Sequence, residues 1–387
     1  MIPFVGLSIV IGGLAFFLYQ KEINKERKAE TLLLEANQNE MEEEPVSSAL
    51  QIDQVRLELG YGLLPLVSET DENYRLTDQI KSLRRQIASE SGFIMPQVRI
   101  QDNLQLPPNS YVVRIKEIEV GSSDIRPNRL LVMDASGDTI DLPGTETIEP
   151  PFGLPAMWVD PDNREEATFK GYTVVDPATV ITTHLTELIR DNMSELLSYV
   201  ETQNLLDELP NEHQKLIAEV VPNQISVGGI QRVLQNLLNE RVSIRDLPTI
   251  LEGISEACAF TRNVTQITEH VRSRLARQIS EQNSTEDNFI PLVTLSAEWE
   301  QIFSDSILDQ GEDKQLSMAP SQLQRFIGAV RTTLDELADK EDPPVVLTSP
   351  SARPFVRSII ERFRPATSIM SQNELHPKAK IKTLGQI

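Results

Sequence analysis

The sequence TETIEPPFGLPAMWVD at residues 145–160, followed by GYTVVDPATVITTHL at residues 171–185, decides how the chain is organised. Prolines restrict the backbone on both sides of Phe152, and Gly153 permits a sharp turn beside it. A bulky apolar residue held between fixed φ angles is typical of a segment that presents side chains to a partner. The alternative is an ordinary buried loop punctuated by prolines.

Composition excludes several classes of function. The 387 residues are enough for roughly two to four domains. A net charge of −22 argues against nucleic-acid binding, because a grip on phosphates needs clustered Lys and Arg. The single cysteine, Cys258, excludes a disulfide framework and fits a reducing compartment. The histidines are too scattered to predict a metal site, and no cofactor is expected (His184, His213, His270 and His376).

The first residues read as a membrane span. Residues 2–19 carry no charge, and a span needs about 20 apolar residues. A signal peptide is the rival interpretation, but no basic segment precedes the run and no clear cleavage site follows it. Lys and Arg residues follow at once, which places the downstream side in the cytoplasm. We therefore expect a transmembrane helix at residues 1–20, the last of a longer series, and a charged linker at residues 21–50.

Residues 51–126, together with residues 173–193, are predicted to form an α+β subdomain. Apolar residues recur at helical spacing from Leu76 to Ile87, with Gly92 as the stop. Strands are expected at residues 52–59, 97–101 and 111–120. Asp176 and Pro177 supply an N-cap and a first-turn proline for a helix that returns to this subdomain. Residues 127–172, with strands at 130–133 and 157–159, form an inserted lobe in this interpretation, and a further strand at 171–175 leads back to the first subdomain.

The second half of the chain changes pattern twice. Residues 194–276 carry helical apolar stripes throughout, including 230–238, 247–254 and 264–279. In residues 277–387, strands alternate with helices, which indicates a small α/β subdomain. Its strands are expected at 289–295 and 345–347, with edge strands at 369 and 381–384, and its helices at 297–308, 321–337 and 352–363.

The predicted fold class is therefore α+β multidomain. It comprises one N-terminal transmembrane helix, a linker and four subdomains: an α+β core, a small inserted β-rich lobe, an all-helical domain and a small α/β C-terminal domain.

Motifs for catalysis are absent from the sequence: we find no GxxxxGK[ST], GxGxxG, HExxH or GxSxG. One alternative function is a membrane-tethered hydrolase that uses Asp176 and His184. The competing interpretation of His184 is a histidine that caps a helix or lies at the edge of the core. Residues 237–254 have the length of a helix-turn-helix. Because their second helix is acidic, we interpret them as plain helix packing.

Several long motifs occur in a familiar order: LELGYGLLPLV (57–67), VRIQDNLQLPPNSYVVRIKEIEVG (98–121), PPFGLPAMWV (150–159), GYTVVDPATVITTHLTELI (171–189) and IQRVLQNLLNERVSIRDLPTILEGI (230–254). With these motifs the chain resembles the cytoplasmic part of the FlhA family, the flagellar type III export-gate proteins. It resembles their LcrD-type virulence paralogues more distantly.

This resemblance implies a non-enzymatic protein of the bacterial inner (plasma) membrane with a cytoplasmic C-terminal part. Family members form a ninefold ring and bind export chaperones that carry late substrates. Their linker contacts an adjacent subunit and export-ATPase components, and their membrane half contacts other export-gate membrane proteins. The family's remaining membrane spans are absent from this sequence. We therefore expect either that the chain is a fragment or that the start of its reading frame has been assigned too far downstream.

By position, the family's chaperone-binding dimple falls on Glu149, Phe152 and Thr183, with Leu154 and Pro151 beside them. The family often has Asp where this chain has Glu149, which changes the reach of the carboxylate. We therefore predict a docking platform for chaperone–substrate complexes. The hydrolase described above and a purely structural ring component are the alternatives.

Overall fold

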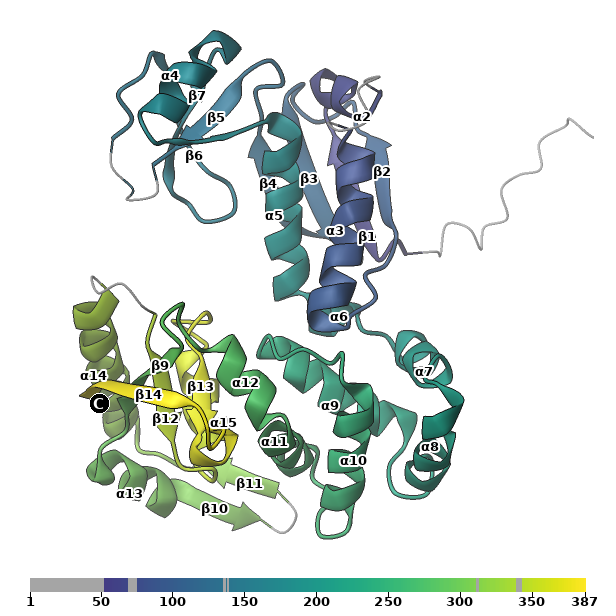
Figure 1. Cartoon of the computed structure of the whole chain (residues 1–387), viewed down its shortest axis with the longest axis vertical. Helices are drawn as coiled ribbons and strands as arrows, with labels where there is room; N and C mark the ends of the chain where they lie inside the picture. Colours follow the sequence, from purple (N-terminus) through teal and green to yellow (C-terminus); the bar gives the residue numbers. More distant parts are fainter. Residues whose placement is uncertain (1–51, 69–74, 135–136, 138, 311–312, 339–342) are drawn as a thin grey trace, which may run out of the picture. The chain divides into compact units, whose positions relative to one another are not determined.

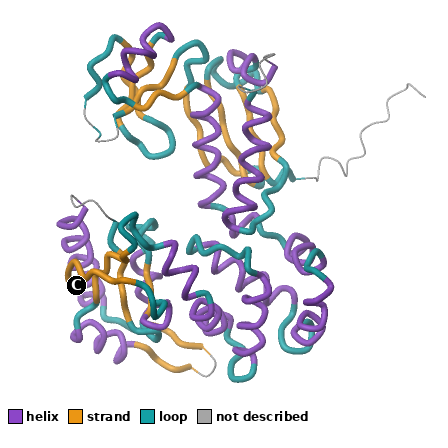
Figure 2. Tube along the Cα trace, viewed as in Figure 1, coloured by secondary structure: helices purple, strands orange, loops and turns teal. Residues whose placement is uncertain are grey.

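The computed structural model describes residues 52–68, 75–134, 137, 139–310, 313–338 and 343–387 (Figure 1). Along this part of the chain, two four-stranded sheets are followed by a long helical segment and then by a third four-stranded sheet (Figure 2). The predicted membrane helix at residues 1–20 and the linker at residues 21–50 lie outside the described residues. Among the helices that are described, none combines the length and apolar character needed to cross a bilayer.

The first sheet has the strand order β2-β1-β3-β4, with β1 and β2 parallel and the other neighbours antiparallel. Helix α3 connects β1 to β2, and α5 packs beside α3 on the same sheet (Figure 1). Gly92 ends α3 with φ +71°, as predicted. The elements are β1 (Val55–Leu59), η2 (Tyr61–Leu63), α2 (Pro65–Ser68), α3 (Leu76–Ser91), β2 (Val98–Asp102), β3 (Ser110–Ile115), β4 (Ile118–Asp124) and α5 (Pro177–Asp191).

The single strand predicted at residues 111–120 is wrong. The chain turns at Lys116 and Glu117, which have φ values of +48° and +70°, and β4 runs back along β3. Two consecutive residues with positive φ form the tight turn that a β-hairpin favours. Lys and Glu are unusual in this conformation, so the turn carried no sequence signal.

The second sheet has the order β6-β7-β5-β8 and is antiparallel throughout. Its own small core consists of Leu130, Val132, Met157, Val159 and Ala167. The sequence prediction missed β6, and it assigned residues 173–175 to the first subdomain, whereas β8 pairs with β5. The elements are β5 (Leu130–Met133), β6 (Gly144–Ile148), β7 (Pro155–Val159), η3 (Pro161–Asn163), α4 (Arg164–Phe169) and β8 (Thr173–Val175).

Residues 193–282 form short packed helices, and α9 and α10 bury the stripes that the spacing predicts. The third stripe, predicted as one helix, is divided at Leu275 into α11 and α12. The elements are α6 (Met193–Leu196), α7 (Tyr199–Asp207), η4 (Asn211–His213), α8 (Gln214–Val220), α9 (Val227–Asn239), α10 (Leu247–Cys258), α11 (Val264–Arg274) and α12 (Ala276–Gln282).

The third sheet is parallel, with the order β13-β12-β9-β14, and the two predicted edge strands are confirmed. The helix predicted at residues 297–308 ends at Ser306, and Leu308 lies on the hairpin strand β10. The elements are β9 (Phe289–Thr294), α13 (Ala297–Ser306), β10 (Ile307–Gln310), β11 (Asp313–Leu316), α14 (Pro320–Ala338), β12 (Val345–Thr348), α15 (Arg353–Ile360), β13 (Ile369–Ser371), η5 (Gln372–Glu374) and β14 (Lys380–Gln386).

A buried ionic cluster joins the helical segment to the third sheet: Glu240, Glu269, Arg272, Arg353 and Glu374. Arg353 Nη1 lies 2.6 Å from Glu240 Oε2, and Arg272 Nη1 lies 3.2 Å from the same oxygen. Arg272 also pairs with Glu374, which is fully buried. Charged groups this deep are tolerated only when they are paired, so removal of one partner leaves an uncompensated buried charge.

The cluster yields a stability prediction. Arg272→Ala is expected to lower the free energy of unfolding by about 3–5 kcal/mol, because Glu374 loses a buried counter-ion. Arg274→Ala, on the same helix but pairing with Glu252 at the surface, is the matched control and is expected to cost under about 1 kcal/mol. Urea unfolding followed by circular dichroism measures both, and equal losses for the two variants would contradict the assigned role of the cluster.

Candidate functional site

Phe152 lies in the loop that joins β6 to β7. The Glu149 N–H donates to the Leu154 carbonyl (2.9 Å), and the Gly153 N–H donates to the Glu149 carbonyl (3.0 Å). Gly153 has φ +70°, a conformation that residues with a β-carbon adopt rarely. These bonds close a compact turn whose apolar side chains remain in solvent: Phe152 is 59% exposed, and Ile148 and Leu154 are also exposed.

Glu149 differs from its neighbours, because its side chain is buried beneath this turn. Its carboxylate accepts from the Phe152 N–H, while Oε2 has no hydrogen-bond partner among the described residues. Burial raises the pKa of Glu149, and the bond from Phe152 opposes the rise only in part. The bond from the Phe152 N–H therefore ties the Glu149 carboxylate to the backbone of the turn.

Phe152 and Thr183 meet in one groove of about 660 Å³. The first comes from the β6–β7 loop and the second from α5, 31 residues apart by number, so two of the predicted site residues are brought together. The other three predicted site residues, Glu149, Pro151 and Leu154, are not part of the groove lining. Leu154 is exposed to solvent.

Most of the groove wall consists of residues that the sequence analysis did not single out. They are polar and lie on the facing surfaces of α3 and α5: Asp78, Gln79, Ser82, Gln86, Thr179, Thr182, Thr186, Glu187 and Arg190. The two helices are bridged where Thr182 Oγ1 donates to Gln79 Oε1 at 2.9 Å. In the sequence, one signal of this wall was available: threonines recur on a single helical face, at positions 179, 182, 183 and 186.

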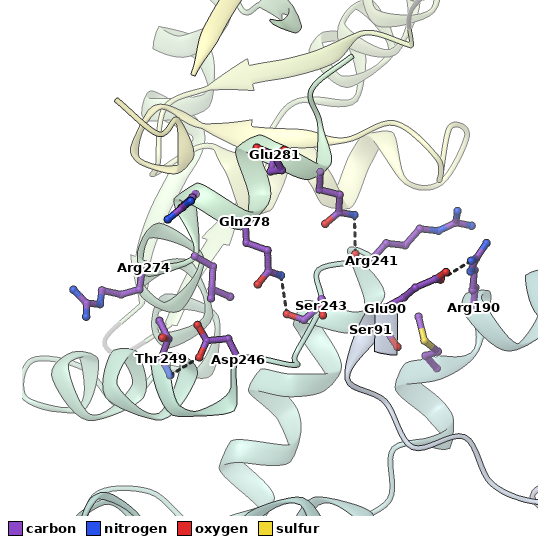
Figure 3. Close-up of a pocket in the computed structure, with 14 residues that line it drawn as sticks. Glu90, Ser91, Arg190, Arg241, Ser243, Asp246, Thr249, Arg274, Gln278 and Glu281 are labelled. Atoms are coloured by element: carbon purple, nitrogen blue, oxygen red, sulfur yellow. Dashed lines mark hydrogen bonds and ion pairs between the residues drawn. The ribbon is translucent and has the colours of Figure 1, made fainter. Parts of the chain in front are cut away.

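A larger cavity of about 950 Å³ adjoins this groove at Arg190, which lines both (Figure 3). Its polar groups bond largely to one another: Arg190 pairs with Glu90 at 2.9 Å, and Gln278 donates to the Ser243 carbonyl at 2.9 Å (Figure 3). Among the residues that the structure describes, no aromatic side chain lines it. The groove at Phe152 is therefore the better candidate for a site that receives an apolar anchor.

The geometry does not favour the hydrolase. Asp176 is a helix cap: its carboxylate accepts from the Thr179 N–H (2.9 Å) and hydroxyl (2.6 Å). His184 is buried, with Nδ1 2.6 Å from the Tyr111 hydroxyl. Burial lowers the pKa of His184 and raises that of Tyr111, which favours the neutral form of both side chains. Within the described structure, no hydrogen bond or ion pair joins Asp176 to His184.

Comparison with known proteins decides the family. The family model described as the FHIPEP family matches residues 1–380. The chain belongs to the FHIPEP family. Among FHIPEP relatives, the flagellar biosynthesis protein FlhA of Caulobacter vibrioides is 51% identical over 389 residues, covering 100% of this chain and 55% of the relative. FlhA of Bacillus subtilis is 36% identical over 374 residues, covering 96% of this chain and 55% of the relative. The sequence-based resemblance to the FlhA family is confirmed, and the chain spans about half the length of these relatives.

Several solved structures share the fold. The Chlamydia pneumoniae CdsV protein gives a TM-score of 0.79 at 25% identity, covering 87% of this chain and 98% of that one. The structure of the Chlamydia pneumoniae CdsV and CdsO protein complex gives a TM-score of 0.78 at 24% identity, covering 87% of this chain and 97% of that one. The nonameric EPEC SctV-C structure gives a TM-score of 0.71 at 21% identity, covering 87% of this chain and 98% of that one. The mixed α and β architecture is therefore that of type III secretion proteins of the CdsV and SctV kind.

The buried state of His184 predicts a pH dependence. A histidine whose pKa is lowered in the folded state stabilises the fold above its unfolded pKa of about 6.5, and this contribution is lost as the pH falls. His184→Gln keeps an acceptor for Tyr111 but does not titrate. Its free energy of unfolding is expected to fall less steeply than that of the native chain from about pH 7 to pH 5.

Urea unfolding at stepped pH measures this difference, with His213→Gln as the control for loss of an imidazole at a more exposed position. Parallel curves for the native chain and His184→Gln would show that His184 is not the group responsible.

Proposed function

We propose that this chain is a docking platform of a flagellar type III protein export gate that binds export chaperones carrying late substrates. The observation that carries the proposal is Phe152, which is exposed on a closed turn and lines a groove together with Thr183. The FlhA relatives supply the flagellar context.

The groove suits one apolar side chain of a partner helix. Phe152 offers an aromatic contact that loses its remaining exposure when the partner arrives, and buried aromatic anchors dominate such interfaces. The polar wall on α3 and α5 presents hydroxyl and amide groups that orient the partner without adding much apolar area. Glu149 supports the turn and keeps an unpaired carboxylate oxygen beneath it.

The wider setting follows from the family. We place the chain in the bacterial inner membrane through residues 1–20, with residues 51–387 in the cytoplasm as part of a homo-oligomeric ring next to other export-gate membrane proteins. The nonameric SctV-C assembly supports the ring. The CdsV and CdsO complex supports contact with export-ATPase components, which we assign to the linker at residues 21–50.

We also propose four subdomains, at residues 51–126 with 176–193, 127–175, 194–276 and 277–387, the second enlarged to include β8. A purely structural ring component remains the competing function. Binding of a flagellar chaperone to the purified chain separates the two, because a component whose only role is assembly has no need of that affinity.

Phe152→Ala is expected to weaken binding of a cognate late chaperone–substrate complex by about 30-fold, the equivalent of about 2 kcal/mol for a buried aromatic anchor. The 387-residue chain is titrated by calorimetry. Because the side chain is largely in solvent in the free protein, thermal unfolding should be almost unchanged.

The matched control is Phe169→Ala, which removes an even more exposed phenylalanine from α4, in the same part of the chain but outside the groove lining. It should leave the affinity unchanged. Equal affinities of the native chain and Phe152→Ala would refute the site, and absence of any chaperone binding to the native chain would refute the function.

A further inference from the structure

The ionic cluster between the helical segment and the third sheet is unbalanced. It holds three carboxylates, Glu240, Glu269 and Glu374, but only two guanidinium groups, Arg272 and Arg353. With every group ionised, three negative and two positive charges leave one net negative charge. Each side chain is at most 17% exposed, so solvent screens this excess weakly.

Glu269 is the carboxylate with the fewest partners. Glu240 contacts both Arg272 and Arg353, and Glu374 also contacts both. Glu374 further accepts from the Ser371 hydroxyl at 2.8 Å. Among the described residues, Glu269 bonds only to Arg353, so neutralising Glu269 removes less attraction from the cluster than neutralising Glu240 or Glu374.

Glu269 also has a route to water. It lines a cleft of about 540 Å³ formed by the start of α11, the start of α15 and β11. Pro354, Phe355 and Lys314 also line this cleft. A proton can reach the Glu269 carboxylate from solvent without opening the junction.

The charged groups around Glu269 lie on several different elements. Arg353 approaches from α15, Arg272 lies on the same helix, Glu240 follows α9, and Lys314 of β11 shares the cleft. Burial raises the pKa of Glu269, and Glu240 adds to the rise, while Arg353 and Arg272 oppose it. For Glu240 the balance is opposite: despite burial, Arg353 and Arg272 keep its pKa below the ordinary value. Arg357 also lowers the pKa of Glu240, but it pairs with Glu361 outside the cluster and so does not change the cluster's excess charge.

We propose that this cluster is a proton-sensitive junction, in which Glu269 takes up one proton from solvent and the neutral carboxyl holds α15 and η5 more firmly against α9 and α11. Proton uptake leaves two carboxylates for two guanidinium groups, which removes the excess charge. The junction is then strongest on the acidic side and weakens as the pH rises.

The direction follows from linkage. A carboxyl group whose pKa is higher in the folded than in the unfolded chain binds its proton more tightly when folded. Its contribution to stability is complete below the ordinary glutamate pKa of about 4.3 and is lost as the pH rises through the raised folded value. This role does not depend on the docking site.

The test is a titration of the glutamate side-chain carboxyl carbons by ¹³C NMR on the 387-residue chain, from about pH 4 to pH 8. One resonance is expected to titrate above the ordinary glutamate range and to be missing from Glu269→Gln. If the Gln variant fails to fold, Glu269→Asp supplies the assignment, because it shifts the resonance while keeping a carboxylate. A Glu269 resonance that titrates at or below the ordinary range overturns the proposal.

Thermal unfolding gives an independent readout. The Tm of Glu269→Gln minus that of the native chain is expected to increase from acidic to neutral pH, because only the native chain acquires the excess charge. Glu281→Gln, at an exposed position on the neighbouring helix α12, is the matched control and should give a constant difference. A constant difference for Glu269→Gln as well would overturn the proposal.

Discussion

The hydrogen bond between Tyr111 and His184, buried beneath α5, fixes the helix on which the candidate site depends. Helix α5 lies close to β4 at Gly121: a β-carbon there would lie 2.7 Å from Cδ1 of Leu188 and 3.0 Å from the His184 ring, so these α5 side chains would have to shift. The same helix begins two residues after β8, which pairs with β5 of the second sheet. With no free linker between them, the second sheet is carried close to α5, and the Phe152 turn meets Thr183.

Local chemistry predicted the elements that begin and end with a strong signal. Gly92 ends α3 and Asp176 begins α5, because each bonds to a backbone group that a helix leaves unpaired, and Pro177 fits the first turn because its φ is fixed and it has no N–H to satisfy. The misses lack such signals. The turn at Lys116 and Glu117 contains no Gly or Asn, and β6 is almost entirely exposed, so no alternation of apolar and polar residues reveals it. Leu308 looked helical because its strand continues an apolar pattern.

The candidate site was predictable only as far as a single segment carries it. Prolines and Gly153 indicated that Phe152 is presented outward, and it is exposed. Burial of Glu149 depends on how the turn closes over it, which spacing alone does not specify. The polar wall comes from α3 and α5, which are about 100 residues apart in the chain, as the Gln79–Thr182 bond shows. Only the packing of two helices on one sheet creates that surface.

The composition of the groove bears on how tightly it holds a partner. A wide apolar surface gives high affinity and slow release, whereas a single aromatic contact in a polar setting gives modest affinity, because association entropy consumes much of the gain. A docking platform of the kind proposed above would need to release successive partners as well as bind them. In the proposed docking, the hydroxyl and amide groups of α3 and α5 would supply direction and selectivity, and Phe152 would supply the aromatic contact. Enlarging the anchor would therefore trade turnover for affinity.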